Sequence, residues 1–184
     1  AYEALDIAEK YHRDICKGLE GLEGLPEEAL GFFAGIRNIV GGAEAREEDY
    51  DLWYDRIVSC GELVSTSIIS RYMTAEGIAN RWLDMRRCFV TDSRHRDAVI
   101  DLDESGSRLR ETVKKGRDEG IGVFVGQGFI GGTAEGEPTT LGREGSDYSA
   151  AAAGYILDAE NVTIWKDVEG ILNADPRIFP DTFH

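Results

Sequence analysis

Residues 121–125 read Ile121-Gly122-Val123-Phe124-Val125, and a stretch that is unusually rich in glycine follows them. This short apolar run of β-forming side chains predicts a buried strand. Residues 161–165 predict a second strand, with Trp165 in the core, and a helix is expected between the two strands, from Ser146 to about Leu157. A strand, a glycine-rich loop, a helix and another strand in this order are typical of an α/β fold with a largely parallel sheet.

The segments upstream of this run predict that the secondary structure changes near Gly77, from helices alone to strands and helices. Residues 78–85 predict another strand, and a helix is expected around Ser107–Glu119. Before Gly77, apolar residues recur every three or four positions. They predict three helices: one that carries the apolar stripe from Leu5 to Leu19, one from Pro26 to about Val40, and one from about Asp49 to Ala75. We therefore expect a mainly helical part, residues 1–77, and an α/β part, residues 78–184, that carries the functional motifs.

The composition is that of an ordinary globular protein and argues against two classes of binding partner, nucleic acids and membranes. The 184 residues are 42% hydrophobic and 30% charged, with a formal net charge of −15. Because nucleic acid requires a basic surface, it is not expected as a partner. No apolar run approaches the ~18 residues needed to cross a bilayer, so no membrane partner is expected either. The three cysteines and three histidines have no metal-like spacing, which predicts no metal site and reduced thiols in a cytoplasmic protein.

Three short matches to nucleotide-binding enzymes lack the rest of their motif. Residues 12–14 and 95–97 both read HRD, as in the catalytic loop of protein kinases. That loop also needs an asparagine five residues after the aspartate, where this chain has Leu19 and Leu102. Residues 126–131 fit G-x-G-x-x-G, but the glycines and proline that follow prevent the helix that a dinucleotide site requires. We interpret the two HRD matches as accidental. Residues 126–131 are either a tight loop at a strand end or, as we prefer, a loop that lets the backbone approach a ligand.

The segment from Gly120 to Gly145 carries nine of the chain's 22 glycines and leads to Arg143. Glycine costs conformational entropy on folding, so this density indicates either loose surface loops or a backbone that approaches a ligand. An arginine can hold a carboxylate through two parallel hydrogen bonds, and Ser146 and Asp147 are suitable N-cap residues for the next helix. A helix start favours anions. The alternative is a capped helix packed on a strand, with Arg143 in a surface ion pair.

Three segments in register resemble one enzyme family. Residues 129–131 (FIG) and 139–151 (TTLGREGSDYSAA) closely resemble the substrate-site signature of aspartokinases. Residues 59–65 (SCGELVS) resemble the helix of that family that reads S-x-G-E-x-x-S. Residues 165–177 resemble its nucleotide segment, and residues 82–86 its middle strand. The resemblance runs from about Ile57 to the C-terminus and is nearest the lysine-sensitive type.

The resemblance implies the amino acid kinase (carbamate kinase-like) fold, with a central, mostly parallel sheet flanked by helices. It implies phosphoryl transfer from ATP to the β-carboxylate of L-aspartate, which gives 4-phospho-L-aspartate in the first step of lysine, threonine and methionine biosynthesis. Phosphoryl transfer requires positioning and cations around the moving group, so Mg²⁺ is implied as well as ATP. No metal-ligand motif accompanies that implication.

The resemblance also assigns roles to individual residues. Six residues are expected to bind the substrate: Glu62, Phe129, Arg143, Gly145, Ser146 and Asp147. Of these, Arg143 would hold a substrate carboxylate, Glu62 would hold the α-ammonium, and Asp147 would orient a catalytic lysine, so that Arg143 and Asp147 serve catalysis. Four residues are expected at the nucleotide: Lys166, Asp167, Leu172 and Arg177. Lys166 and Leu172 replace a threonine and a tyrosine that are usual in the family, and Glu144 replaces a glycine.

The family's lysine-bearing glycine loop (KFGG) has no counterpart in these residues. We therefore expect an incomplete catalytic domain that is inactive alone, from a longer, homo-oligomeric parent with C-terminal regulatory domains. Two alternatives stay open: another amino acid kinase, acting on glutamate, acetylglutamate or a nucleoside monophosphate, or a non-catalytic regulatory relative. The carboxylate of Glu62 argues against a nucleotide acceptor, because it calls for an ammonium partner.

Overall fold

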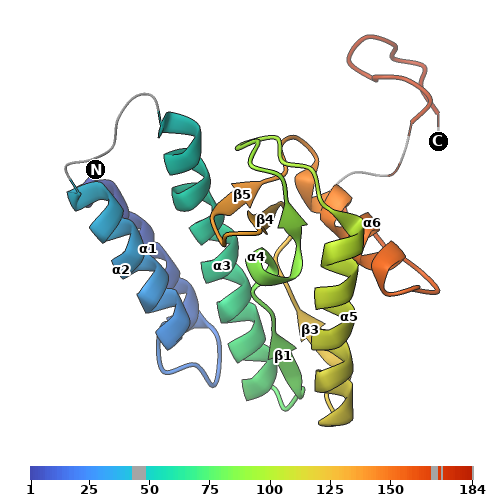
Figure 1. The fold of residues 1–184 in the computed structure, drawn as a ribbon. Helices are drawn as coiled ribbons and strands as arrows, with labels where there is room; N and C mark the ends of the chain where they lie inside the picture. The colour runs from blue at the N-terminus through green and yellow to red at the C-terminus, as the bar shows by residue number, and fades with distance from the viewer. Residues whose placement is uncertain (43–48, 167–169, 171, 184) are drawn as a thin grey trace.

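The chain folds into helices that flank two short sheets (Figure 1). The computed structural model describes residues 1–42, 49–166, 170 and 172–183. Within these residues the helices are α1 (Tyr2–Gly18), α2 (Glu27–Gly41), α3 (Tyr50–Ala75), α4 (Met85–Cys88), α5 (Leu102–Asp118) and α6 (Gly145–Ile156). The strands are β1 (Asn80–Trp82), β2 (Val90–Thr91), β3 (Val123–Val125), β4 (Ile130–Thr133) and β5 (Pro138–Thr140).

The strands form two sheets rather than the single sheet that the sequence predicts. In the first, β1 and β3 are parallel, with Arg81 opposite Phe124. In the second, β4 lies between β2, to which it is parallel, and β5, to which it is antiparallel. Helix α3 packs against β1, β3 and β5, so one helix spans both sheets. The mixed α/β class and the preference for parallel pairing are as expected.

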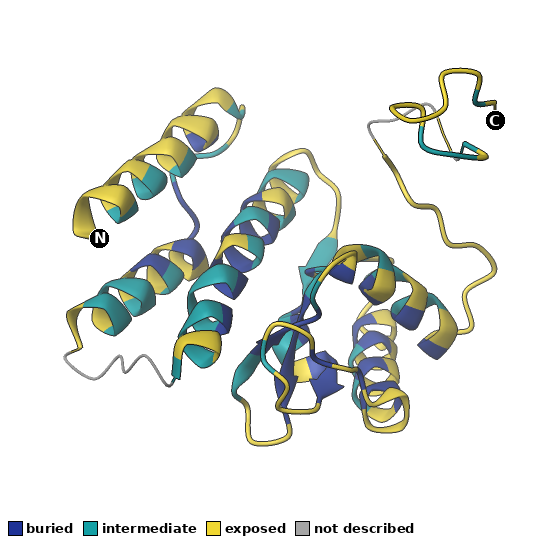
Figure 2. Ribbon diagram, turned by 90° about the horizontal axis from the view of Figure 1, so that it is seen from above, coloured by how far each residue is buried: buried dark blue, intermediate teal, exposed yellow. Residues whose placement is uncertain are grey.

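Helix α3 also separates two hydrophobic clusters. The larger cluster includes Leu63 of α3 and packs around the strands, α4, α5 and α6; its most deeply buried members are Leu63, Phe89, Ile130 and Ile156. The smaller cluster contains Val64 and Ile68 of α3 and packs against the hairpin of α1 and α2, with Cys16, Ala29 and Phe33. Figure 2 shows buried residues on the α3 sides that face these neighbours. The predicted helical part therefore shares α3 with the α/β part.

The start of α5 lies earlier than the sequence pattern predicted. The carboxylate of Asp101 accepts hydrogen bonds from the backbone N–H groups of Asp103 and Glu104, both at 3.0 Å. This N-cap starts the helix at Leu102, five residues before Ser107. After Leu102 the first turn is polar and therefore shows no apolar periodicity. Capping decides this boundary, and hydrophobic spacing does not detect it.

Two predictions about strands are wrong. Residues 161–165 form no strand, and the side chain of Trp165 is 90% exposed rather than in the core. Branched side chains favour a strand only where a neighbouring strand pairs with it, and no described strand lies beside this segment. Strand β3 forms as expected but is half-exposed, because β1 pairs with only one of its edges.

Much of the glycine-rich stretch forms a hairpin instead of a ligand-binding loop. Strands β4 and β5 pair within it, and their glycines permit close packing. A Cβ atom at Gly132 would lie 2.5 Å from the carbonyl oxygen of Arg86, and one at Gly131 would lie 2.7 Å from a methyl group of Thr91. These two glycines therefore serve the contact with β2 and α4.

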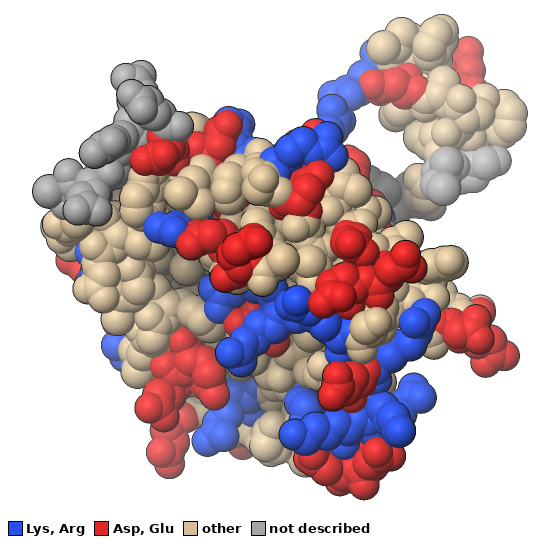
Figure 3. Space-filling model, in the orientation of Figure 1, with Lys and Arg blue, Asp and Glu red and all other residues tan. Residues whose placement is uncertain are grey.

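Acidic and basic side chains are interspersed over the face that carries α5 (Figure 3). Ion pairs also form within two helices at a spacing of three or four residues: on α1, Arg13 with Glu9 and both Lys10 and Lys17 with Asp14, and on α5, Arg108 with Glu104. Such exposed pairs stabilise a helix by only about 0.3–0.5 kcal/mol each. The net charge of −15 is therefore not gathered into one acidic patch on this face.

Replacing Gly132 with alanine is expected to destabilise the chain by about 1–3 kcal/mol, because the added methyl group meets a backbone carbonyl that cannot move aside. Urea unfolding followed by circular dichroism measures the change. The control is Gly122→Ala, at a glycine with no atom within 4 Å of the added Cβ, which should change stability by less than about 0.5 kcal/mol. Equal stability of the two variants would contradict the packing role of Gly132.

Candidate functional site

A cavity of about 440 Å³ opens where β1 and β3 end. Its polar rim comes from the turn after β3 and from the first turns of α6: Gly126, Gln127, Gly128, Ser146 and Ser149. The remaining lining is mainly apolar and includes Leu83, Met85 and Phe124. Ligands of α/β proteins bind outside the carboxyl ends of parallel strands, so the cavity has the position expected of a binding site.

The turn after β3 and the start of α6 hold each other in place. A Cβ atom at Gly128 would lie 3.0 Å from Cα of Ser146, and one at Gly145 would lie 2.8 Å from the Phe129 ring. The backbone N–H of Phe129 donates to Oγ of Ser149 at 2.9 Å. Phe129 has φ +68°, in the left-handed region that bulky residues rarely adopt. Backbone outliers of this kind cluster at functional sites, which agrees with the substrate contact predicted for Phe129.

Helix α6 begins differently from the prediction. Its N-cap is Glu144, with φ 59°, and the helix starts at Gly145, so Ser146 and Asp147 lie in the first turn instead of capping it. No side chain accepts a hydrogen bond from the first turn as a cap. The N-terminal N–H groups therefore keep the partial positive charge that favours an anion.

The charged side chains around this helix start pair with one another. Lys166 Nζ lies 2.7 Å from a carboxylate oxygen of Asp147 and 3.9 Å from one of Glu144. The guanidinium of Arg143 lies 3.8 Å from Glu144, and its side chain is 95% exposed. Arg143 therefore makes the surface ion pair of the alternative interpretation, with the neighbouring residue Glu144. The substrate contacts expected of Arg143 and Glu62 stay predictions.

Glu62 lies on the face of α3 that looks toward the sheets. Two turns before it is Asp55, and one turn after it is Thr66, both buried. The hydroxyl oxygen of Thr66 accepts a hydrogen bond from the amide of Gln127 at 2.7 Å, which joins this part of α3 to the cavity rim. The carboxylate of Glu62 makes no hydrogen bond or ion pair within the described residues. Burial penalises its charged form and raises its pKa.

The four residues predicted to bind the nucleotide do not all lie near the start of α6. Lys166 lies beside Asp147, and Asp167 lies outside the described residues. Leu172 and Arg177 belong to the C-terminal segment, which extends away from the other elements in Figure 1. Arg177 is 88% exposed and pairs with Asp175 at 2.8 Å. The structure therefore does not bring Leu172 and Arg177 to the cavity, and their nucleotide role stays a prediction.

Two residues at the site were not singled out by the sequence. Gln127 is 3% exposed, and its amide oxygen also accepts the backbone N–H of Met85 at 2.8 Å. Asp55 is fully buried and bonds to His95, which belongs to the second HRD match. Gln127 occupies a variable position of a motif that we rejected, and Asp55 belongs to no motif. Neither residue could be recognised before its partners were known.

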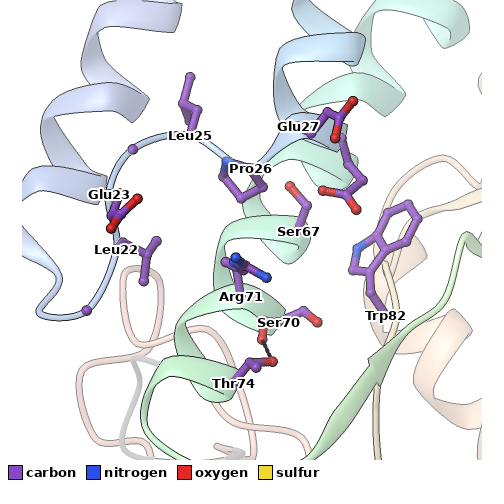
Figure 4. A pocket seen from close by; sticks show the side chains of 13 residues that line it. Leu22, Glu23, Leu25, Pro26, Glu27, Ser67, Ser70, Arg71, Thr74 and Trp82 are labelled. Carbon is purple, nitrogen blue, oxygen red and sulfur yellow. Dashed lines mark hydrogen bonds between the residues drawn. The ribbon is translucent and has the colours of Figure 1, made fainter.

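A larger cavity lies elsewhere. It has a volume of about 670 Å³ and lies between the loop at residues 21–26, α3 and Trp82 (Figure 4). The side chains of Ser70, Arg71 and Thr74 point into it from α3. It contains none of the predicted site residues, and acidic and basic groups both line it. Size alone therefore does not identify the functional site.

The described residues contain no group of three or more His, Cys, Asp or Glu side chains that could hold a metal ion. No helix within the described ranges is long and apolar enough to span a membrane.

Comparison with known proteins places the chain in a family. The model of the amino acid kinase family matches residues 4–183, so the chain belongs to this family. Within the family its relatives are aspartokinases. The aspartokinase of Chlamydia muridarum is 35% identical over 96% of this chain and 37% of the relative. The lysine-sensitive aspartokinase 3 of Escherichia coli is 37% identical over 67% of this chain and 27% of the relative.

Solved structures agree with this placement. Aspartokinase III of E. coli in complex with aspartate and ADP superposes with a TM-score of 0.83 at 30% identity, over 98% of this chain and 40% of that one. The aspartate kinase of Clostridium acetobutylicum superposes with a TM-score of 0.71 at 22% identity, which supports the fold alone. The expected amino acid kinase fold is confirmed. The chain spans well under half the length of these relatives.

Replacing Glu62 with glutamine is expected to raise the midpoint of thermal unfolding at pH 7. The folded chain retains the Glu62 proton to a higher pH than the unfolded chain, whose ordinary pKa is 4.5, so ionisation destabilises the fold as the pH rises. Glutamine removes this penalty, and its advantage should shrink as the pH falls toward 4.5. Thermal scans between pH 4.5 and pH 7 measure the effect. A lower midpoint for Glu62→Gln at pH 7 would refute it; Glu111→Gln, on an exposed position of α5, is the control and should change little.

Proposed function

We propose that this chain is the central part of an aspartokinase, which transfers the γ-phosphoryl group of ATP to the β-carboxylate of L-aspartate. The bond between the γ-phosphorus and the bridging oxygen breaks, ADP leaves, and 4-phospho-L-aspartate forms. The observation that carries the proposal is the half-buried carboxylate of Glu62, which has no partner in the described residues and lies on the α3 face joined to the cavity rim. A nearby cation stabilises the charged form of a carboxylate in such a position, and the ammonium group of an amino acid supplies one.

Three elements would hold the acceptor beside the cavity, which among the predicted substrate residues is lined by Ser146. Glu62 binds the α-ammonium group, the ring of Phe129 packs beside the substrate, and the N–H group of Ser146 faces a carboxylate. Arg143 has its side chain in solvent, and within the described residues its ion pair is the 3.8 Å contact with Glu144. Such an exposed contact is worth little, so the guanidinium can turn to a substrate carboxylate, where two charge-assisted hydrogen bonds are stronger.

The phosphoryl donor would approach from the side of Lys166. Its ammonium group lies beside Asp147 in the first turn of α6, so a cation stands next to the proposed acceptor site. Asp167, Leu172 and Arg177 complete the proposed nucleotide contacts. Mg²⁺ would arrive with the ATP phosphates, and we assign no residue of this chain to it. We further propose that the intact enzyme is a homo-oligomer with regulatory domains after this chain.

The direct test is an acceptor panel with the intact protein. ADP release is followed with ATP and, in turn, L-aspartate, L-glutamate, N-acetylglutamate and a nucleoside monophosphate. The proposal predicts turnover with aspartate and little with the other acceptors. Turnover with another acceptor instead of aspartate would identify that acceptor as the substrate. The absence of turnover with all four acceptors would indicate a non-catalytic relative. The 184 residues alone should form no aspartyl phosphate.

In the intact protein, Arg143→Ala is expected to cost about 2–4 kcal/mol in transition-state binding, because a bidentate charge-assisted pair is lost. The measurement is kcat/KM at low aspartate concentration. The control is Arg13→Ala, at an arginine on α1 that pairs with Glu9 on the same helix. An unchanged kcat/KM for Arg143→Ala would remove this residue from the proposed site.

A further inference from the structure

The buried carboxylate of Asp55 joins three segments. Asp55 Oδ1 accepts a hydrogen bond from the hydroxyl of Thr140 at 2.6 Å. Asp55 Oδ2 accepts from Nδ1 of His95 at 2.9 Å and from the backbone N–H of Arg96 at 3.0 Å. Asp55 is 0% exposed, so these donors compensate a carboxylate that has been removed from water. Helix α3, the loop at residues 92–99 and the end of β5 therefore meet at one side chain.

The loop at residues 92–99 is fixed to α3 by further contacts. Arg96 has φ +67°, an unfavourable conformation for an arginine. Its guanidinium pairs with Asp51 at 2.9 Å and lies 4.9 Å from the centre of the Tyr54 ring. Both partners belong to the α3 turn that carries Asp55. The helix thus holds the strained backbone of Arg96 through both its side chain and its N–H group.

This loop is packed against the segment that leads to Arg143. The backbone N–H of Ala98 donates to the carbonyl oxygen of Thr140 at 3.0 Å. Gly142 has φ +74°, and a Cβ atom there would lie 2.9 Å from Oδ1 of Asp97 and 3.0 Å from the carbonyl oxygen of Arg96. Thr140 precedes Arg143 by three residues. The backbone that presents Arg143 therefore rests on a loop that Asp55 holds.

The same helix carries Glu62. Glu62 follows Asp55 by seven positions, or two helical turns, so the two residues lie on one face of α3, about 10 Å apart along its axis. The proposed ammonium ligand and the anchor of the Arg143 segment are thus fixed to one rigid element. The side chain of Arg143 is 95% exposed and has few contacts of its own, so its reach depends on where its backbone is held.

We infer that Asp55 is a positioning residue: with Thr140 and His95 it holds the Arg143 segment at a set distance from Glu62, and so determines the affinity for the amino-acid acceptor. This inference rests on the proposed function. Asp55 does not touch the acceptor, and it acts through Thr140 and the backbone that follows. The second HRD match thereby has a role, in which its histidine and arginine serve as ligands of a buried carboxylate.

The experiment compares two buried neighbours in the intact protein. Thr140→Val removes the hydroxyl that binds Asp55, whereas Thr140→Ser retains it. We expect Thr140→Val to raise the KM for aspartate about tenfold with little change in the KM for ATP, and Thr140→Ser to restore most of the loss. The control is Thr139→Val, which is equally buried but loses a hydroxyl bound to Thr91 at 2.7 Å. It should lower the unfolding temperature and leave both KM values unchanged.

A double-mutant cycle with Arg143→Ala separates positioning from loss of structure. If Thr140 acts through the Arg143 segment, Thr140→Val should not raise the KM for aspartate further once Arg143 is alanine. Full additivity would overturn the inference, as would a Thr140→Val enzyme that is less stable but has an unchanged KM for aspartate. A wild-type protein without aspartate-dependent ADP release would instead overturn the proposed function. Should Thr140→Val fail to fold, His95→Leu against His95→Asn provides the same comparison, because asparagine retains a donor to Asp55.

Discussion

One face of α3 holds the α/β part together. The two sheets share no strand, and α3 packs against both of them. Near its start the carboxylate of Asp55 binds Thr140, and three turns later the hydroxyl oxygen of Thr66 accepts hydrogen bonds from Trp82 at 3.0 Å and from Gln127 at 2.7 Å. These contacts set the position of the β5–α6 segment relative to the turn after β3. The geometry of the proposed site therefore depends on the polar side chains of one helix face.

Glu62 lies between these two sets of contacts and has no partner of its own in the described residues. A half-buried carboxylate whose charge destabilises the fold does not contribute to structural stability. It suits a site that attracts an ammonium group, because the free energy lost by burying the charge is recovered when the ammonium group binds. The acidic side chains of this chain thus have two different roles. Asp55 is fully compensated and structural, and Glu62 is uncompensated and, in our proposal, binds the substrate.

The sequence predicted what local patterns determine. Apolar periodicity located α1, α2 and α3, the apolar run at residues 121–125 located β3, and the long signature around Arg143 led to the family. It did not predict the hairpin of β4 and β5, because Gly131 and Gly132 are required by distant backbone atoms of Phe89 and Arg86. The strand expected at residues 161–165 does not form for a related reason. A strand needs a pairing partner from elsewhere in the chain, and the local sequence does not show whether one is present. The partners of Asp55 and the exposure of Arg143 likewise depend on how segments far apart in the chain are arranged.

The central claim is that Glu62 recognises the ammonium group of an amino-acid acceptor. Isothermal titration of the intact protein with L-aspartate and with succinate tests it directly, because succinate keeps both carboxylates and lacks the ammonium group. The account predicts that aspartate binds at least about tenfold more tightly, a difference of about 1.4 kcal/mol, and that Glu62→Gln removes most of this difference. Equal affinity of the wild-type protein for the two ligands would contradict it.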